Sequence, residues 1–282
     1  MQWEALTSTD FAAAVQQTGV CVLPLGVLER HSEHLPLGTD FLNAHRIACL
    51  AAEKEPAVVF PPFYFGQIYE ARCFPGALTL RPTLLLELLQ AVLDEIGRNG
   101  FRKIILFNGH GGNAHLLPFL AQSSLWEEKP YHLYLFQDAL NEEREKAWQA
   151  TVETPLHGHA CECETSITLA NFPELVKMER VPPQPGEPRG RMSHLKGNYS
   201  GIWWYADYPE HYAGDARSAS AGIVHSHSAF DLIVGPAIGL SGALCRDDHV
   251  ERMWLDNLPI AAQIVSLLAE ADGFGCGTQA LQ

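Results

Sequence analysis

Residues 20–40 read VCVLPLGVLERHSEHLPLGTD, and this stretch decides the fold class. Its first six residues, Val20 to Leu25, are an apolar run with the length of a buried β-strand. A polar loop follows, and a helix is predicted from Asp40 to Lys54. Buried strands that alternate with helices are typical of parallel-sheet proteins. The stretch therefore predicts an α/β fold with polar residues directly after its first strand.

The rest of the chain repeats this strand-then-helix order. We predict further strands at residues 58–60, 103–107 and 131–136, and further helices at residues 82–99 and 113–126, in a segment ending at 171, and at 250–271. The helix at 82–99 is the best defined, because Pro82 stands near its start and Gly100 just past its end. A long loop region rich in Pro, Gly and aromatic residues covers about 180–228. We expect a single domain over residues 1–282.

Charge and composition narrow the classes of partner. Hydrophobic residues make up 47% of the 282, and 19 basic against 33 acidic residues give a formal charge of −14. That charge repels nucleic acid and anionic membrane surfaces, so we expect a small-molecule partner. The N-terminus lacks a basic and then apolar leader, and no run is long enough to span a membrane, which favours a cytoplasmic protein. The seven irregularly spaced cysteines predict mostly buried thiols.

The loop after the first strand carries the first candidate metal ligands. Glu29 and His31 lie two residues apart, so in extended backbone their side chains point to the same side. A carboxylate and an imidazole together suit a divalent metal ion. Asp40 follows a Pro-x-Gly-Thr turn that could fold it back toward the strand end, but an Asp at the start of a helix is also a common N-cap. Spacing alone leaves both interpretations of Asp40 open.

A second polar turn follows the strand at residues 103–107. It reads NGHGGN, residues 108–113, and presents His110 at the carboxyl end of the strand, where ligands gather in open α/β sheets. The glycines also suggest a phosphate-binding loop. However, the pattern is neither G-x-G-x-x-G nor a Walker A sequence, and no Lys followed by Ser or Thr comes after it. A metal-ligating His110 is therefore the favoured interpretation.

A third cluster reads HGHACECETS, residues 157–166, and opens the helix that ends at Asn171. Within an α-helix, His159 and Glu164 would lie roughly 140° apart around the axis. They can share a site only if His159 lies in the cap or if the helix begins late. The alternative for Glu164 is an ordinary acidic residue on a helix.

Taken in this order, the three segments resemble the creatininase family of amidohydrolases. The resemblance is carried by E-x-H-x-x-H-L-P-L-G-T-D at residues 29–40, N-G-H-G-G-N at 108–113, and H-A-x-x-x-E-T-S at 159–166 with Pro-Glu-Leu at 173–175. It spans roughly residues 20–175 and then weakens, with a trace at 214–220.

The resemblance implies a three-layer α/β/α fold with a mostly parallel central sheet, and a binuclear metal-dependent amidohydrolase that is often a hexamer. Through a metal-activated water, such an enzyme would hydrolyse a C–N bond of a small cyclic amide or formamide. Its cofactors would be two divalent metal ions, zinc before manganese or iron. By position, the metal ligands would be Glu29, His31, Asp40 and His110, with Asp40 bridging. His159 would transfer protons, and Glu164 would be a ligand or a base.

Departures from the family pattern point away from creatinine as the substrate. In creatininase itself an aromatic residue and a glutamate ligand follow the metal-binding histidine, where this chain has Gly111 and Gly112. The second metal would then lack one ligand unless Glu164 supplies it. The first motif also departs at Arg30, Ser32 and Glu33, which could line a different pocket.

Other functions and roles remain open. The same metals could open the ring of a cyclic carbonyl compound such as an inositol-derived ketone, or the chain could be a non-catalytic metal-binding regulatory protein with a closed coordination sphere. The aromatic run at residues 203–212 could form a lid over a substrate or an oligomer interface. His225 and His227 are candidates for the pocket. Surface or core positions are the default interpretation for His45, His115, His132, His194 and His249.

Overall fold

The structure is a computed structural model that describes residues 1–136, 150, 152–155, 158–195 and 200–222. These residues belong to one compact unit, Met1–Gly242. The expected single domain therefore stays a prediction beyond that unit, and the expected helix at 250–271 lies outside the described residues.

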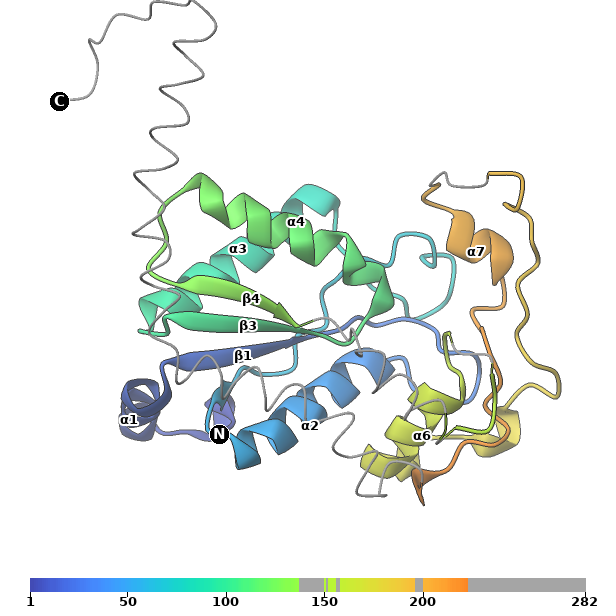
Figure 1. Ribbon diagram of the computed structural model, residues 1–282, viewed down its shortest axis with the longest axis horizontal. Helices are drawn as coiled ribbons and strands as arrows, with labels where there is room; N and C mark the ends of the chain where they lie inside the picture. The colour runs from blue at the N-terminus through green and yellow to red at the C-terminus, as the bar shows by residue number, and fades with distance from the viewer. Residues whose placement is uncertain (137–149, 151, 156–157, 196–199, 223–282) are drawn as a thin grey trace, which may run out of the picture. The chain divides into compact units, whose positions relative to one another are not determined.

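The predicted parallel sheet is confirmed. Its strands are β1 (Val20–Leu25), β2 (Val58–Val59), β3 (Lys103–Asn108) and β4 (His132–Phe136). They are arranged in the order β2-β1-β3-β4, and every neighbouring pair is parallel. All six residues of β1 are buried, as the apolar run predicts for a strand covered on both faces. The carboxyl ends of the strands therefore share one edge of the sheet, and α6 and α7 lie beyond it (Figure 1).

Helices cover both faces of the sheet and make the three layers. The covering helices are α2 (Thr39–Lys54), α3 (Pro82–Arg98) and α4 (Leu116–Ser123). α3 and α4 lie on one face and α2 on the other (Figure 1). Successive side chains of a strand point to opposite faces of the sheet. Leu23 and Leu106 pack in the core formed with α3 and α4, whereas Val22 lies near Ala48 of α2. Each fully buried Leu of this kind contributes about 1.5–3 kcal/mol.

The helix predicted over residues 113–126 is wrong in its extent. That segment is divided into a 3-10 turn (Gly111–Ala114), α4, and a second 3-10 turn (Ser124–Trp126). Pro118 lies in the first turn of α4, where its missing N–H costs no hydrogen bond. A longer helix would place this proline in its interior, so the helix begins only at Leu116.

Several short elements complete the described part. They are α1 (Ser8–Thr18), α6 (Glu162–Asn171), α7 (Trp203–Asp207) and the 3-10 turns Trp3–Ala5, Pro173–Leu175 and Met178–Arg180. The sequence analysis made no prediction for α1, although Thr7 caps its start and Gly19, with φ of 61°, ends it. α7 interrupts the region expected to be a loop.

α6 is fixed against α2 by polar contacts. Asn43 of α2 donates from Nδ2 to Thr168 Oγ1 at 2.9 Å, and Asn171 Nδ2 donates to Asn43 Oδ1 at 3.0 Å. Both contacts join segments more than a hundred residues apart, and they hold the second half of α6 against α2.

The described cysteines and helices agree in part with the sequence predictions. Cys21, Cys49 and Cys161 are buried, whereas Cys73 is exposed. Burial raises the pKa of the Cys21 thiol, which keeps it protonated and unreactive. None of the described helices is both long and apolar enough to cross a membrane.

Candidate metal centre

The ends of β1 and β3 bring four candidate ligands together. Because these two strands are hydrogen-bonded neighbours, the segments that follow them meet at the same edge of the sheet. Glu29, His31 and Asp40 follow β1, His110 follows β3, and all four side chains are buried. Asp40 lies in the first turn of α2, whose N-cap is Gly38, so the N-cap interpretation of Asp40 is wrong.

Two glycines allow the backbone segments to approach this closely. A Cβ added at Gly26 would overlap the backbone N of Phe41, and one added at Gly109 would lie 2.9 Å from the carbonyl oxygen of Asp40. Any side chain at either position would therefore push the start of α2 away from the strand ends. The glycines place Asp40 between the two loops.

The first ligand cluster consists of Glu29, Asp40 and His110. His110 Nδ1 lies 2.9 Å from Glu29 Oε1 and 2.9 Å from Asp40 Oδ2. Both carboxylate oxygens are nevertheless buried without a hydrogen bond of acceptable geometry. Oxygen and nitrogen ligands at about 2.0–2.2 Å from one divalent ion are spaced in this way. Three candidate ligand atoms thus lie buried and close together, and both oxygens among them lack a hydrogen bond, which fits a metal ion.

The second cluster consists of His31, Asp40 and Glu164. His31 Nε2 lies 2.9 Å from Asp40 Oδ1 and 3.8 Å from Glu164 Oε2. One donor atom from each residue lies within 4.8 Å of the others. Asp40 therefore faces the first cluster with Oδ2 and the second with Oδ1. Asp40 thus lies where one carboxylate could bridge two metal positions, and the bridging role that the family resemblance implies stays a prediction.

The late start of α6 resolves the question of how His159 and Glu164 share a site. α6 begins at Glu162, so His159 lies ahead of the helix. Ala160 has φ of 54°, and its backbone N–H donates to Glu164 Oε2 at 2.6 Å. This left-handed turn directs Glu164 back toward the strand ends. His159 joins a third possible ligand group with Glu29 and His31.

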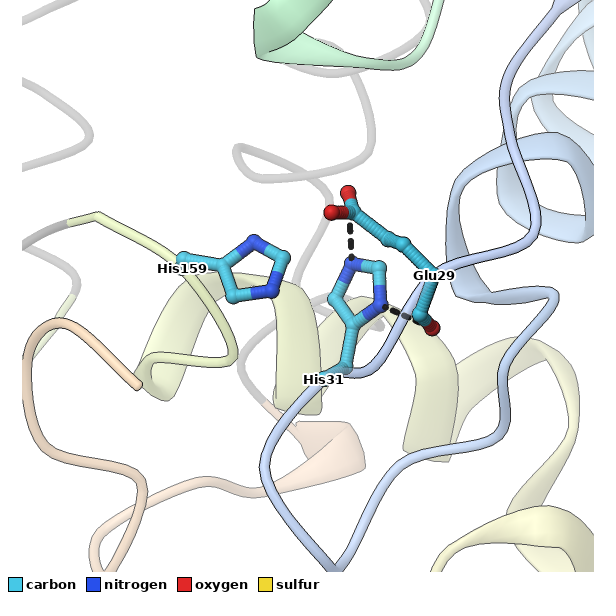
Figure 2. Close-up of side chains that lie close together, drawn as sticks. All are labelled: Glu29, His31 and His159. Atoms are coloured by element: carbon cyan, nitrogen blue, oxygen red, sulfur yellow. Dashed lines mark hydrogen bonds and ion pairs between the residues drawn. The ribbon is translucent and has the colours of Figure 1, made fainter. Parts of the chain in front are cut away.

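The ring of His159 lies beside that of His31. Their centroids are 4.1 Å apart with 30° between the planes, and Figure 2 shows the two rings with Glu29. His159 Nε2 donates to the carbonyl oxygen of Arg30 at 2.8 Å, which leaves Nδ1 as the acceptor nitrogen. Donation from His31 Nδ1 to the carbonyl oxygen of Glu29 at 3.3 Å likewise leaves His31 Nε2 facing the second cluster.

His211 is a site residue that the sequence analysis missed. Its side chain is buried, and its Nε2 donates to Glu29 Oε2 at 2.9 Å. Its backbone has φ of 52°, and its carbonyl oxygen accepts from the N–H of Ser32, where φ is 54°. Strained backbone of this kind clusters at functional sites. His211 lies 182 residues from Glu29, so no local spacing could have indicated it, although the family trace at 214–220 begins three residues later.

His110 is oriented by two asparagines and a neighbouring loop. Its Nε2 donates to the carbonyl oxygen of Gln67 at 2.8 Å, which directs Nδ1 toward the first cluster. Asn113 accepts from the N–H of Gln67 at 3.0 Å and donates to Asn108 Oδ1 at 3.3 Å. Such outer contacts hold a metal-ligating imidazole in one tautomer and one orientation.

The crowded charges shift the pKa values in opposite directions. Burial lowers the pKa of His31, but the carboxylates of Asp40 and Glu29 outweigh it and raise the value to about 10. Burial also lowers the pKa of His110, but the carboxylates of Glu29 and Asp40 outweigh it and raise the value. Burial raises the pKa of Glu29, but attraction to His110 and His159 outweighs it and lowers the value. At neutral pH, protons on His31 and His110 balance the buried carboxylates, as a cation would.

The pKa values of His159 and Glu164 shift mainly because of burial. Burial and the nearby charge of His31 lower the pKa of His159 to about 4, so this imidazole is neutral at pH 7. Burial raises the pKa of Glu164 to about 8, although 32% of its side chain remains exposed. Opposite shifts in neighbouring groups are typical of sites that handle protons.

Comparison with known proteins identifies the family. The model for creatininase, described as creatinine amidohydrolase, matches residues 4–226. This chain belongs to the creatininase family. The match begins earlier and ends later than the resemblance seen in the motifs alone, which spans roughly residues 20–175.

Relatives of this creatininase-family chain act on different substrates. The 3-dehydro-scyllo-inosose hydrolase of Thermotoga maritima is 28% identical over 244 residues, covering 78% of this chain and 76% of the relative. Creatinine amidohydrolase of Pseudomonas putida is 28% identical and covers 64% and 75%. A mycofactocin precursor peptide peptidase of Mycolicibacterium smegmatis is 31% identical and covers 57% and 61%.

Solved structures share the fold. A candidate creatinine amidohydrolase from Bacteroides fragilis has a TM-score of 0.72 at 22% identity and covers 88% of this chain and 97% of that one. A creatininase has a TM-score of 0.71 at 21% identity and covers 87% and 98%. Related creatininase structures include a Zn–Zn form and a Mn form. The expected three-layer creatininase-like fold is confirmed.

Gly112 has no room for a side chain. A Cβ at Gly112 would overlap His110 Nε2 and lie 2.7 Å from Gln67 Oε1. Glu164 instead brings a carboxylate to the second cluster. That Glu164 supplies a ligand to the second metal stays a prediction.

A cavity of about 690 Å³ opens onto both clusters. Its lining includes Glu29, Asp40, His110, His159 and Glu164, and also Trp203 and Trp204 of α7. The ring of Trp204 meets that of His159 edge-on, with centroids 6.1 Å apart. This position favours substrate contact for the two tryptophans over the interface alternative.

The other histidines mentioned in the sequence analysis lie outside the clusters. His115 lines the cavity wall from an exposed position. His45, His132 and His194 belong to none of the described metal-ligand groups. His225, His227 and His249 lie outside the described residues.

Proposed function

We propose that this chain is a metal-dependent hydrolase that cleaves the C–N bond of an amide, with cyclic amides and formamides as the reactive class. The observation that carries the proposal is the position of Asp40. Each of its two carboxylate oxygens faces a separate cluster of buried donor atoms. A shared carboxylate between two such clusters is typical of binuclear hydrolytic sites.

The donor set fits two divalent ions. Glu29, Asp40 and His110 would hold one, and His31, Asp40 and Glu164 the other. Imidazole and carboxylate ligands suit zinc, and manganese or iron can take the same set. A bound pair of ions would activate water for attack and polarise the carbonyl oxygen of the substrate.

His159 is the proposed proton carrier. It is neutral at pH 7, and its Nδ1 is the acceptor nitrogen because Nε2 donates to Arg30. It would accept a proton from the attacking water at Nδ1 and pass it to the leaving nitrogen. Its low pKa makes the protonated form a strong donor for that second step. Glu164 remains either a ligand or a second proton acceptor.

Metal analysis and turnover test the proposal together. We expect the purified protein to contain zinc or manganese and to lose hydrolysis of a cyclic amide or formamide on treatment with a chelator, with recovery when the metal is restored. His159→Ala should retain its metal and lose turnover by about a hundredfold, within the range for general acid–base catalysis. Unchanged turnover with retained metal would remove His159 from the mechanism. His194→Ala, at an exposed position outside the cavity lining, is the control.

A second candidate function uses the same site to open the ring of a cyclic ketone. The relative from Thermotoga maritima, a 3-dehydro-scyllo-inosose hydrolase, favours it. Turnover of a cyclic polyol ketone without turnover of any amide would establish this reading instead. The non-catalytic alternative is disfavoured, because residues of both clusters line an open cavity where a closed coordination sphere would be expected.

A further inference from the structure

The cavity is larger than the reactive group requires. Pockets of about 300–1,000 Å³ hold drug-sized ligands, and this one measures about 690 Å³. The two clusters lie at one part of its wall, so a single small ring bound there would leave most of the space to water. The residues of the remaining wall therefore indicate the chemistry of the part of the substrate that does not react.

Two adjacent glycines have different roles in that wall. Gly112 is packed against His110 and Gln67, with no room for a side chain. At Gly111, in contrast, an added Cβ would meet nothing within 4 Å. Gly111 lines the cavity. Its missing side chain leaves open space beside the first cluster, which no packing requirement explains.

Several side chains of the cavity lining are apolar. Ile68 and Leu116 line the cavity together with Trp203 and Trp204, whose rings meet edge to face at 85°. Trp204 is also supported by Tyr208, at a centroid distance of 4.6 Å. Indole rings held in this way offer broad apolar contact area to a ligand at little entropic cost.

Among the described residues that line the cavity, four carry carboxylates and none is a lysine or an arginine. Three of the carboxylates belong to the two clusters. The fourth is Glu70, whose Oε2 accepts from Gln67 Nε2 at 2.8 Å. The side chain of Gln67 thus holds Glu70 in the wall. The backbone carbonyl oxygen of Gln67 orients His110. A carboxylate fixed in this position favours a cationic or neutral group over an anionic one.

We propose that the substrate is an amide with an extended, partly apolar body that is neutral or cationic outside the reacting bond. Gly111 leaves the space for this body, the wall of Trp203 and Trp204 contacts it, and Glu70 sets its charge preference. This inference rests on the proposed C–N hydrolysis, and it names the part of the substrate that does not react.

A series of formamides tests the inference with one readout. Hydrolysis of each adds one water across the C–N bond and releases formate and the free amine. N-ethylformamide and N-phenylbutylformamide differ in body size. N-aminohexylformamide and formamidohexanoate have similar lengths and opposite end charges. We expect kcat/KM to be at least about tenfold higher for the longer member of the first pair and for the cationic member of the second.

Two variants locate the preference. Gly111→Leu should reduce the ratio of kcat/KM between the long and the short formamide by about tenfold, because its side chain fills the open space. Ala13→Leu, which places the same leucine side chain at an exposed position of α1, should leave that ratio unchanged. Glu70→Gln should reduce the preference for the cationic compound by about tenfold. Glu33→Gln removes an exposed carboxylate outside the cavity lining and should leave this preference unchanged.

Binding separates this inference from the proposed function. N-ethyl- and N-phenylbutyl-methanesulfonamide cannot be hydrolysed as amides, and their affinities follow from the quenching of tryptophan fluorescence. Tighter binding of the long compound, lost in Gly111→Leu, would support the inference even if no formamide is turned over. Turnover of formamides without preference for length or charge, and equal binding of the two sulfonamides, would overturn it and leave the proposed function standing.

Discussion

The segments that follow β1 and β3 reach the candidate metal centre within a few residues of the sheet, whereas the region from His159 to His211 reaches it from the far part of the chain. The first region holds its ligands by strand pairing and by close packing at Gly26 and Gly109. The second depends on isolated contacts, such as His211 to Glu29 and His159 to the carbonyl of Arg30. Changes in the first should therefore abolish the site, and changes in the second should tune it.

Asp40→Asn should have the largest effect, because both clusters use this carboxylate. We expect loss of both metal ions and a decrease in kcat/KM of about a thousandfold or more, since metal polarisation supplies several kcal/mol of transition-state stabilisation. Metal content and turnover are measured on the same preparation. Asp10→Asn, an exposed carboxylate of α1, is the matched control. Full metal content in Asp40→Asn would contradict the bridging role.

Glu164→Gln tests the second region at its point of contact with the first. If Glu164 is a ligand, metal content should fall from about two ions per chain to about one. The Ala160 N–H can still donate to the remaining amide oxygen, so the start of α6 should keep its shape. If metal content stays the same and only turnover falls, Glu164 acts as a base and the second ion has another ligand.

His211→Ala should have an intermediate effect. Its Nε2–H orients Glu29 without joining either cluster, and outer contacts of this kind are worth about 10–100-fold in metal affinity or activity. His211→Gln, which retains a donor, should recover part of the loss. The competition of a metal-binding dye measures the affinity, and His194→Ala serves as the comparison. Equal affinity in wild type and His211→Ala would show that the hydrogen bond from His211 to Glu29 has no role in metal binding.

The smallest expected effect is a gradual change of metal affinity with pH. His31, with a pKa of about 10, and His110, whose pKa is also raised, must lose protons before they can bind a metal. Affinity should therefore rise with pH up to about 10, with about two protons released from the histidines at pH 7 and a third from Glu164, whose pKa is about 8, if it is a ligand. Calorimetry in two buffers of different ionisation enthalpy counts these protons. His159→Ala should leave the count unchanged because His159 is already neutral. Binding without proton release would contradict the raised values.

The stability of the metal-free protein should show the opposite pH dependence. The folded-state pKa of His31 lies above its ordinary value of 6.5, so its charge stabilises the fold fully below about pH 6.5. That contribution is lost as pH rises through about 10, because the buried carboxylates then lack a partner. Thermal unfolding of the chelated protein across this range measures the effect, and bound metal should remove it.

Most of the sheet and its helices could be predicted, because each depends on local periodicity. Apart from Pro24, every residue of Val20–Leu25 is apolar, which suits a strand covered on both faces. Pro82 begins α3, and Gly100 follows shortly after its end. The exception is the segment around α4, where Pro118 changes which residues can be helical.

The site was predictable to the extent that it follows a strand. Glu29, His31 and His110 come directly after β1 and β3, so a parallel sheet brings them to one edge whatever the rest of the chain does. Asp40 and Glu164 had two interpretations each on spacing alone. Only the N-cap at Gly38 and the left-handed turn at Ala160 placed their carboxylates beside the other ligand candidates.

The sequence by itself determined the α/β class and the motifs that carry the candidate ligands, because strand and helix periods and the parallel sheet act over short stretches of chain. Only the tertiary structure decided which oxygen of Asp40 faces which cluster, that His211 holds Glu29, and that Gly111 leaves open space in a cavity walled by Trp203 and Trp204. These features depend on contacts between segments separated by as many as 182 residues, and no local pattern of residues encodes such distances.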